Sequence, residues 1–235
     1  MSFENTYWST EQVQLLYNAE NPEQAIIQPI ITKIIQGLKP EQVLDYGCGD
    51  AFMAKLLSPL IKIDLYDRNQ KSLDKIFSEL QKDNCKRLYS EEEILGDFYD
   101  CIVLSFVLVC IDTEEEQYRI MRKLRSSLKQ DGGTLIITNS HPCFLQHEFT
   151  AFKTSLTPDN FNYAEGGKPY NVSIKQPLGF PSVTFTDYQW QLSFWINMAI
   201  ECGFQLHEMI EIPDTSYKNL PENKLYPPFL ILKFK

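Results

Sequence analysis

The sequence predicts an α/β fold, in which a doubly wound and mostly parallel sheet carries helices on both of its faces. Along residues 42–138, short apolar runs alternate with amphipathic helical patterns, and this alternation is typical of βαβ units. The first apolar run ends in a glycine-spaced turn at residues 45–49, which leads directly into a helical pattern. With 235 residues, 43% of them hydrophobic, we expect one domain over 1–235 with a sizeable core.

The first part of the chain, residues 1–40, is expected to form a helical cap. Ser9 or Thr10 can cap a first helix, because a hydroxyl oxygen accepts from the free N–H groups of the first turn. A second helix is predicted over residues 22–37, and Pro29 within it predicts a kink.

The strands and helices then follow in a regular order. Five strands are predicted at residues 42–46, 62–66, 85–89, 99–106 and 134–138. A helix from about Thr113 carries three glutamates in its first turn and basic residues later, which matches the helix dipole. A last helix ends at Gly203, and two more strands follow, one through Ile212 and one at residues 228–234.

The glycine-spaced turn is a candidate ligand site. Glycine allows close approach of a ligand, and free N–H groups at a helix start face it. The pyrophosphate fingerprint requires glycine where this chain has Phe52, and no Gly-Lys-Ser/Thr follows as in a P-loop. Asp45 would repel phosphates but suits an amino group or a sulfonium. The alternative is a tight loop whose glycines serve geometry alone.

A second acid, Asp67, ends the next predicted strand, about twenty residues after the turn. A carboxylate at that place can accept hydrogen bonds from both hydroxyl groups of a ribose. The alternative is a solvated loop acid, but the spacing to the glycine turn favours ribose binding.

Residues 45–51 resemble motif I of the class I S-adenosylmethionine-dependent methyltransferases, which is an acid followed by Gly-x-Gly and usually a third glycine. Ala51 stands here in that third place. Residues 98–108 are similar to the fourth strand of that family and the loop after it. Residues 128–135 are similar to its approach to strand five, with Asp131 in place of a proline. The resemblance covers residues 40–140 well and 187–235 fairly.

This resemblance implies a Rossmann-like sheet of seven strands with an antiparallel last strand, and S-adenosylmethionine as the cofactor. Backbone N–H groups of the turn would approach the methionine carboxylate, Asp67 would hold the ribose, and Ser90 would flank the adenine. The N-terminal helices, with Tyr7 and Trp8, would close over the site. The cofactor-binding residues expected on this basis are Asp45, Tyr46, Gly47, Cys48, Gly49, Asp67, Arg68, Ser90, Ser105 and Phe106.

Residues 140–186 break the strand–helix rhythm and are rich in aromatic residues, proline and glycine. An insertion after the fifth strand would lie beyond the carboxyl ends of the strands, where α/β sheets bind ligands. We expect a lid or β-hairpin flap that shapes an acceptor pocket, although a satellite core or a dimerisation surface would have the same composition. The candidate pocket residues are Phe144, Phe149, Tyr163 and Tyr170.

His141 directly follows the fifth strand, and a His-Pro pair here resembles a subset of small-molecule methyltransferases. A neutral imidazole at this place can remove a proton from an acceptor hydroxyl, which makes His141 the candidate catalytic residue. The alternative is that His141 hydrogen-bonds the lid backbone or lines the pocket.

Composition restricts the partners. The formal net charge of −9 argues against a nucleic-acid partner. The sequence has neither an apolar run of membrane-spanning length nor a signal peptide, so we expect a cytoplasmic protein. Six cysteines without a C-x-x-C pair, beside three histidines, predict reduced thiols and no metal. Oligomeric state is not readable from this pattern.

The sequence therefore predicts S-adenosylmethionine-dependent methyl transfer to a small, apolar or amphipathic acceptor, with oxygen, nitrogen and carbon acceptors all open. Two rivals remain. One is a non-catalytic binding protein with the same fold. The other is an NAD-dependent oxidoreductase, which is disfavoured because Asp45 would repel a pyrophosphate and Phe52 stands where its fingerprint requires glycine.

Overall fold

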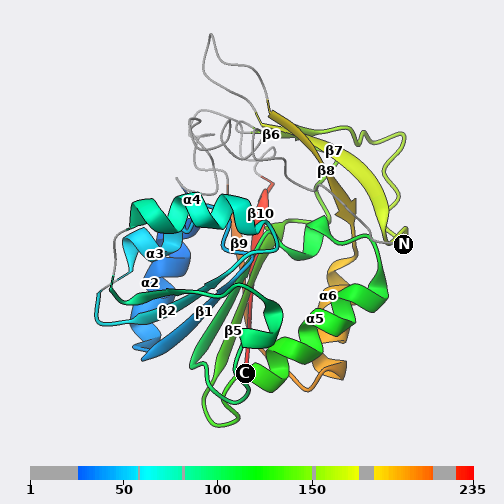
Figure 1. Cartoon of the computed structure of the whole chain (residues 1–235). Coiled ribbons are helices and arrows are strands. Elements are labelled where there is room, and N and C mark those ends of the chain that lie inside the picture. Colours follow the sequence, from blue (N-terminus) through cyan, green and yellow to red (C-terminus); the bar gives the residue numbers. More distant parts are fainter. Residues whose placement is uncertain (1–25, 58, 81–82, 150–151, 175–182, 214–225) are drawn as a thin grey trace.

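The computed structural model describes residues 26–57, 59–80, 83–149, 152–174, 183–213 and 226–235. Its centre is a seven-stranded sheet in the order β3-β2-β1-β4-β5-β10-β9 (Figure 1). The strands are β1 (Gln42–Tyr46), β2 (Lys62–Tyr66), β3 (Cys85–Arg87), β4 (Cys101–Ser105), β5 (Thr134–Ser140), β9 (Leu206–Ile212) and β10 (Phe229–Phe234).

The pairing of these strands confirms the predicted sheet. β1 pairs in parallel with β2 on one side and with β4 on the other, and β5 continues the parallel part. β10 is antiparallel to both of its neighbours, β5 and β9. The strand order reverses at β1, so the carboxyl ends of β1, β2 and β4 flank the point where doubly wound sheets bind ligands.

Two groups of helices cover the two faces of the sheet. α2 (Gln28–Leu38), α3 (Phe52–Leu56) and α4 (Gln70–Leu80) pack on one face, in a core that includes Val43, Ile63 and Val103. α5 (Glu114–Ser127) and α6 (Leu192–Glu201) pack on the other face, against Leu44 and Ile102. Because both faces are covered, the strands read as near-continuous apolar runs in the sequence.

Several element boundaries differ from the sequence prediction. Pro29 lies in the first turn of α2, directly after two π-helical residues, Ile26 and Ile27. Residues 22–25 of the predicted helix fall outside the described residues, and the kink stays a prediction. β3 ends at Arg87, and the predicted loop after β4 contains a short 3-10 helix, η3 (Leu108–Cys110). The predicted start of α5 near Thr113 is confirmed, and the Thr113 hydroxyl caps the helix by accepting from the Glu116 N–H at 3.4 Å. The helix with Ser9 or Thr10 falls outside the described residues.

The lid segment forms a second sheet of three antiparallel strands, β6 (Phe152–Thr154), β7 (Lys168–Ile174) and β8 (Val183–Gln189). We call this the cap sheet. Figure 1 shows it beyond the carboxyl ends of the parallel strands. Within it, β8 packs against η3, which also contacts β5. Along β7 and β8, buried residues alternate with more exposed ones, so one face of the cap sheet is turned toward the protein interior. None of the described helices is long and apolar enough to cross a membrane.

A buried acid in β2 is held by neighbours from two other strand segments. Asp64 is 4% exposed; it accepts a hydrogen bond from the Tyr99 hydroxyl at 2.7 Å and one from the Gln42 side-chain amide at 3.3 Å. Burial raises the pKa of Asp64, while the hydrogen bond from Tyr99 lowers it. Tyr99 therefore compensates for part of the loss of hydration of this carboxyl group.

We expect Tyr99→Phe to lower the free energy of unfolding by about 1–3 kcal/mol, because it leaves the buried Asp64 carboxyl with one donor fewer. Urea unfolding monitored by circular dichroism measures this difference. The control is Tyr89→Phe, which removes the same hydroxyl group from a side chain that is 65% exposed. Equal stability of the two variants would show that the Tyr99 hydrogen bond contributes nothing.

Candidate functional site

The glycine-spaced turn after β1 is docked on the end of β2. The N–H groups of Gly47 and Cys48 both donate to the carbonyl oxygen of Tyr66, at 2.7 and 3.0 Å. Gly47 has φ 76°, in the left-handed region that glycine adopts without strain. Ala51, at the place of the usual third glycine, also has a left-handed backbone (φ 51°) and precedes the first residue of α3. The turn is therefore a rigid connection between two strand ends.

Gly47 also permits a close approach by a third segment. A Cβ atom added to Gly47 would lie 2.4 Å from Cγ2 of Val107, in the loop after β4. Real Cβ atoms do not come this close to a neighbour, so Val107 occupies the space that any other residue at 47 would need. The absence of a side chain at Gly47 thus brings the ends of β1, β2 and β4 together at one place.

Asp67 is tied directly to the turn. Its Oδ2 accepts from the Gly49 N–H at 2.9 Å, and its Oδ1 accepts from the Asn69 N–H at 2.7 Å. Burial raises the pKa of Asp67, and these two N–H donors and the nearby Arg68 oppose that shift. Each carboxylate oxygen has two lone pairs, so both oxygens keep the capacity to accept one more hydrogen bond.

Carboxyl groups surround the turn. Burial raises the pKa of the Cys48 thiol, and the charges of Asp45, Asp67 and Asp50 raise it further. Asp45 itself is 4% exposed. Asp45 and Asp50 flank the glycines in the chain and Asp67 is bonded to Gly49, so three acids lie around the turn, and their charge favours a cationic ligand over a phosphate. In the described part of the chain, no group of three or more His, Cys, Asp or Glu residues could hold a metal ion.

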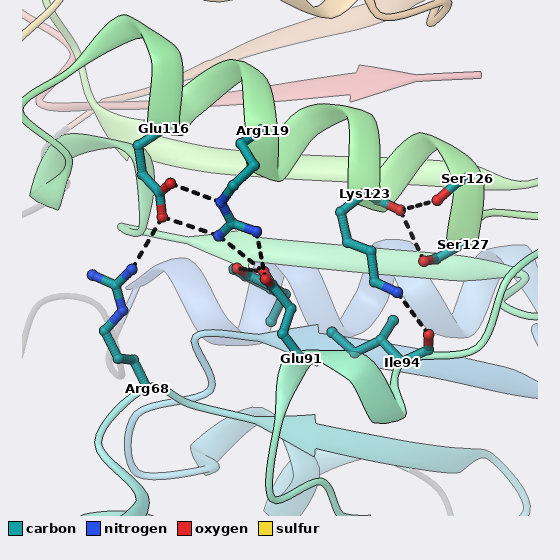
Figure 2. A network of polar contacts seen from close by, with 9 residues as sticks. Arg68, Glu91, Ile94, Glu116, Arg119, Lys123, Ser126 and Ser127 are labelled. Carbon is teal, nitrogen blue, oxygen red and sulfur yellow. Dashed lines mark hydrogen bonds and ion pairs between the residues drawn. The ribbon is translucent and has the colours of Figure 1, made fainter.

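The side chains of two residues expected at the cofactor, Tyr46 and Arg68, take part in a polar network with α5, and their binding roles stay predictions. The Tyr46 hydroxyl donates to Glu91, which also pairs with Arg119 of α5. Arg119 Nε donates to Glu116 at 2.7 Å, and Arg68 Nη2 donates to the other oxygen of Glu116 at 3.0 Å. Figure 2 shows this network bridging α5, the segment at Glu91 and the loop at Arg68. Its role is to hold the loops after β2 and β3 against α5.

The other expected cofactor residues also lie at or after the carboxyl ends of strands in the parallel part of the sheet. Ser90 directly precedes η2 (Glu91–Glu93), beside the network. Ser105 ends β4. Phe106 follows it with φ 55°, a left-handed backbone that is uncommon for a bulky residue, and its N–H donates to the carbonyl oxygen of Thr138 at 2.8 Å. The binding roles of these residues stay predictions.

His141 is 2% exposed, and both of its ring nitrogens are in hydrogen bonds. Nδ1 accepts from the Cys143 N–H at 3.3 Å, and Nε2 lies 2.9 Å from the Glu211 carboxylate. Since Nδ1 acts as the acceptor, Nε2 is the nitrogen that carries the proton toward Glu211. Burial lowers the pKa of His141, and Glu211 partly opposes this. Burial thus favours the neutral form of the ring, and the same contacts also allow the alternative role of holding the lid backbone.

The expected pocket residues separate into two groups. Phe144 contacts the His141 ring at 4.6 Å between centroids and the Tyr226 ring at 5.2 Å. Phe149 is buried, and its ring lies 5.0 Å from that of Phe152 in β6. These two residues lie where the chain passes from β5 into the cap sheet.

Tyr163 and Tyr170 belong to the other side of the cap. The Tyr163 hydroxyl accepts from the Leu192 N–H at 2.9 Å, so it caps the start of α6. Tyr170 is buried on β7, directly opposite Asp187 of β8. Tyr163 thus contacts the start of α6, while Tyr170 faces the interior of the cap, and the pocket roles of both residues stay predictions.

Sequence reasoning missed two residues of this region, Asp187 and Glu211. The pattern of β8 contained a signal for the first, because residues 183, 185, 187 and 189 fall on one face of a strand, and an acid stands in that otherwise largely apolar series. No sequence signal pointed to Glu211, since its contact with His141 joins β9 to the loop after β5 across 70 residues.

Comparisons with known proteins agree with this geometry. A family model described as a methyltransferase domain matches residues 18–170. No curated protein sequence matches the chain.

Solved structures share the fold. The CcbJ methyltransferase from Streptomyces caelestis has 17% identity and a TM-score of 0.70, with 100% of this chain and 99% of that chain covered. A S-adenosylmethionine-dependent methyltransferase from Aquifex aeolicus has 14% identity and a TM-score of 0.61, with 97% and 98% covered. Another such enzyme from Clostridium acetobutylicum ATCC 824 has 11% identity and a TM-score of 0.62, with 88% and 89% covered. At these identities the likeness shows the fold.

We expect Gly47→Ala to lower the free energy of unfolding by about 2–4 kcal/mol, from the left-handed backbone and the clash with Val107 together. Urea unfolding measures the loss. The matched control is Gly37→Ala in α2, where an added Cβ meets nothing within 4 Å and alanine favours the helix by up to about 1 kcal/mol. If both variants were equally stable, the turn would not be the close contact described above.

Proposed function

Because this chain belongs to the family of methyltransferase domains, whose model matches residues 18–170, we propose that it transfers the methyl group of S-adenosylmethionine to a small acceptor molecule. One observation supports the choice of cofactor. The Gly49 N–H, in the turn after β1, donates a 2.9 Å hydrogen bond to Asp67, which follows β2. An acid at the end of β2, beside a glycine turn at the end of β1, supports binding of an adenosyl ribose.

The residues of the site fit this cofactor. Both oxygens of Asp67 accept one backbone N–H each and have lone pairs left for two ribose hydroxyls. The carboxylates of Asp45 and Asp50, close to the Cys48 thiol, suit an ammonium and a sulfonium. The N–H groups of Gly47 and Gly49 are already donated to Tyr66 and Asp67. We therefore propose that Gly47 serves the cofactor indirectly, by letting Val107 pack against the turn and fix its position, and not by offering a free donor.

S-adenosylmethionine supplies an electrophilic methyl group on a positively charged sulfur. The protein then needs to orient the acceptor in a site without competing water, because orientation alone is worth about 7–11 kcal/mol in well-arranged intramolecular reactions. We propose that the cap sheet provides this enclosure. The fold neighbours from Aquifex aeolicus and Clostridium acetobutylicum ATCC 824 are S-adenosylmethionine-dependent enzymes, which supports the cofactor proposed here.

We propose a small acceptor because the cap sheet, and not a basic groove, lies beyond the strand ends. Its buried face carries Phe152, Tyr170 and Val172, and the net charge of −9 disfavours a polyanion. All six cysteines are free, which supports the expected cytoplasmic location, since thiols persist in reducing compartments.

Calorimetric titration tests the proposal. We expect S-adenosylmethionine and S-adenosylhomocysteine to bind and NADH not to bind. Transfer of labelled methyl groups from the cofactor to a metabolite extract then tests the reaction. Cofactor binding without any labelled product would favour a non-catalytic binding protein, and binding of NADH alone would favour an oxidoreductase.

Asp67→Ala should weaken S-adenosylhomocysteine binding by about 1.5–3 kcal/mol, because it removes charge-assisted hydrogen bonds to the ribose. The measurement is the dissociation constant from calorimetry, taken with the thermal midpoint, because Gly49 also loses its acceptor. Asp131→Ala, which removes an exposed acid in a turn, is the control. An unchanged dissociation constant would remove Asp67 from the site.

For His141 we propose the role of proton acceptor at Nδ1, which requires that the 3.3 Å hydrogen bond from the Cys143 N–H opens when the acceptor binds. The His141 variant separates that role from a structural one. His141→Ala should lower labelled methyl transfer by about 10²-fold or more and leave S-adenosylhomocysteine binding nearly unchanged. His207→Ala, which changes an exposed histidine of β9, is the control. Equal transfer rates would return His141 to the role of holding the Cys143 backbone and Glu211.

A further inference from the structure

The buried face of the cap sheet contains one acid in an apolar surrounding. In the β7–β8 pair, Tyr170 lies opposite Asp187, Val172 opposite Phe185, and Ile174 opposite Val183. Residues directly opposite each other in an antiparallel pair share a face, so these six side chains lie on the same side. We call this the inner face of the cap sheet.

The inner face is connected to the strand ends that carry the candidate site. Phe152 of β6 belongs to the same core, and its ring lies 5.5 Å from that of Phe229 at the start of β10. Phe229 in turn contacts the ring of Phe106 edge to face at 5.7 Å. Phe106 precedes Val107, the residue that packs on the glycine turn. A continuous series of aromatic contacts thus joins the inner face to the turn.

Asp187 is 3% exposed and has one hydrogen-bond partner among the described residues, the Cys110 thiol, with Sγ 3.8 Å from Oδ1. A thiol is a weak donor. No lysine, arginine or histidine of the described chain forms an ion pair with it. Burial raises the pKa of Asp187 to about 8, which is the behaviour of a carboxyl group that lacks a cation.

Other buried polar atoms without partners lie on the two strands that pack against η3. These strands are β8, which carries Asp187, and β5. In β5, both side-chain amide atoms of Asn139 are buried without a partner in the described structure, and in β8 the same holds for Oε1 of Gln189. Buried polar groups in native proteins are rarely left unpaired, so this region has hydrogen-bonding capacity that a ligand can use.

We propose that Asp187 is the polar anchor of the acceptor pocket, and that the acceptor is a small molecule with a basic nitrogen, held as an ammonium against this carboxylate. The inference rests on the function proposed above and adds the chemical class of the acceptor. An ammonium supplies the charge that Asp187 lacks, and the ring of Tyr170, directly opposite Asp187 in the strand pair, attracts cations through its face. An acceptor with a carboxylate at this point would be repelled.

The test uses three probes with one aryl-ethyl body: 2-phenylethylamine, 2-phenylethanol and 3-phenylpropanoate. Each is titrated into the protein of residues 1–235 saturated with S-adenosylhomocysteine, at a pH above 8, where the Asp187 carboxyl group is ionised and the amine is still protonated. We expect the amine to bind about tenfold more tightly than the alcohol, and the carboxylate to bind worst. In Asp187→Asn the amine and the alcohol should bind within about twofold of each other, because the neutral amide removes the charge.

Asp159→Asn is the matched control, since it makes the same change at an exposed position of the lid segment, and it should keep the amine preference. Asp187→Asn should have a thermal midpoint at or above that of the unchanged protein, because it replaces a buried acid that has no cation.

Failure of the amine to bind more tightly than the alcohol, a preference that survives in Asp187→Asn, or a large fall in its thermal midpoint would each overturn the inference. Failure of S-adenosylhomocysteine to bind is a separate result, and it would count against the proposed cofactor.

Discussion

The carbonyl oxygen of Tyr66, which accepts the N–H groups of both Gly47 and Cys48, is the contact on which the candidate site depends. It docks the turn after β1 on the end of β2, and the bond from Gly49 to Asp67 closes the same junction one residue further on. Val107 then fills the space above Gly47. Three strand ends meet within a few ångströms because one residue has no side chain and a left-handed backbone.

Around this junction, the side chains on the two faces of the sheet have different contacts. Asp45 points to the face of α2 and α3, as Val43 does, while Tyr46 points to the face of α5 and donates to Glu91. Successive residues of one strand thus serve two purposes, since side chains alternate between faces. The acids that favour a cation lie beside the turn, and the network of Glu91, Arg119 and Glu116 holds the adjoining loops in place.

The fold and the donor half of the site were predictable because they depend on local patterns. Alternating strands and helices, the glycine turn and the helix start near Thr113 each involve residues close together in the chain. The acceptor half was less predictable. Tyr163 caps α6 from 29 residues away, and His141 is held by Glu211. Aromatic composition predicts that a lid exists, but it cannot assign each ring to a pocket or to a helix end.

The sequence by itself determined the order of the elements, the sheet with its antiparallel last strand, and the two acids at neighbouring strand ends, because periodicity and turn chemistry act over short distances. Only the tertiary structure decided which groups remain available. It engaged both ring nitrogens of His141, drew Tyr46 and Arg68 into an ion-pair network, and buried Asp187 beside a single thiol. Hydrogen bonding and desolvation depend on the partners that folding brings from distant parts of the chain.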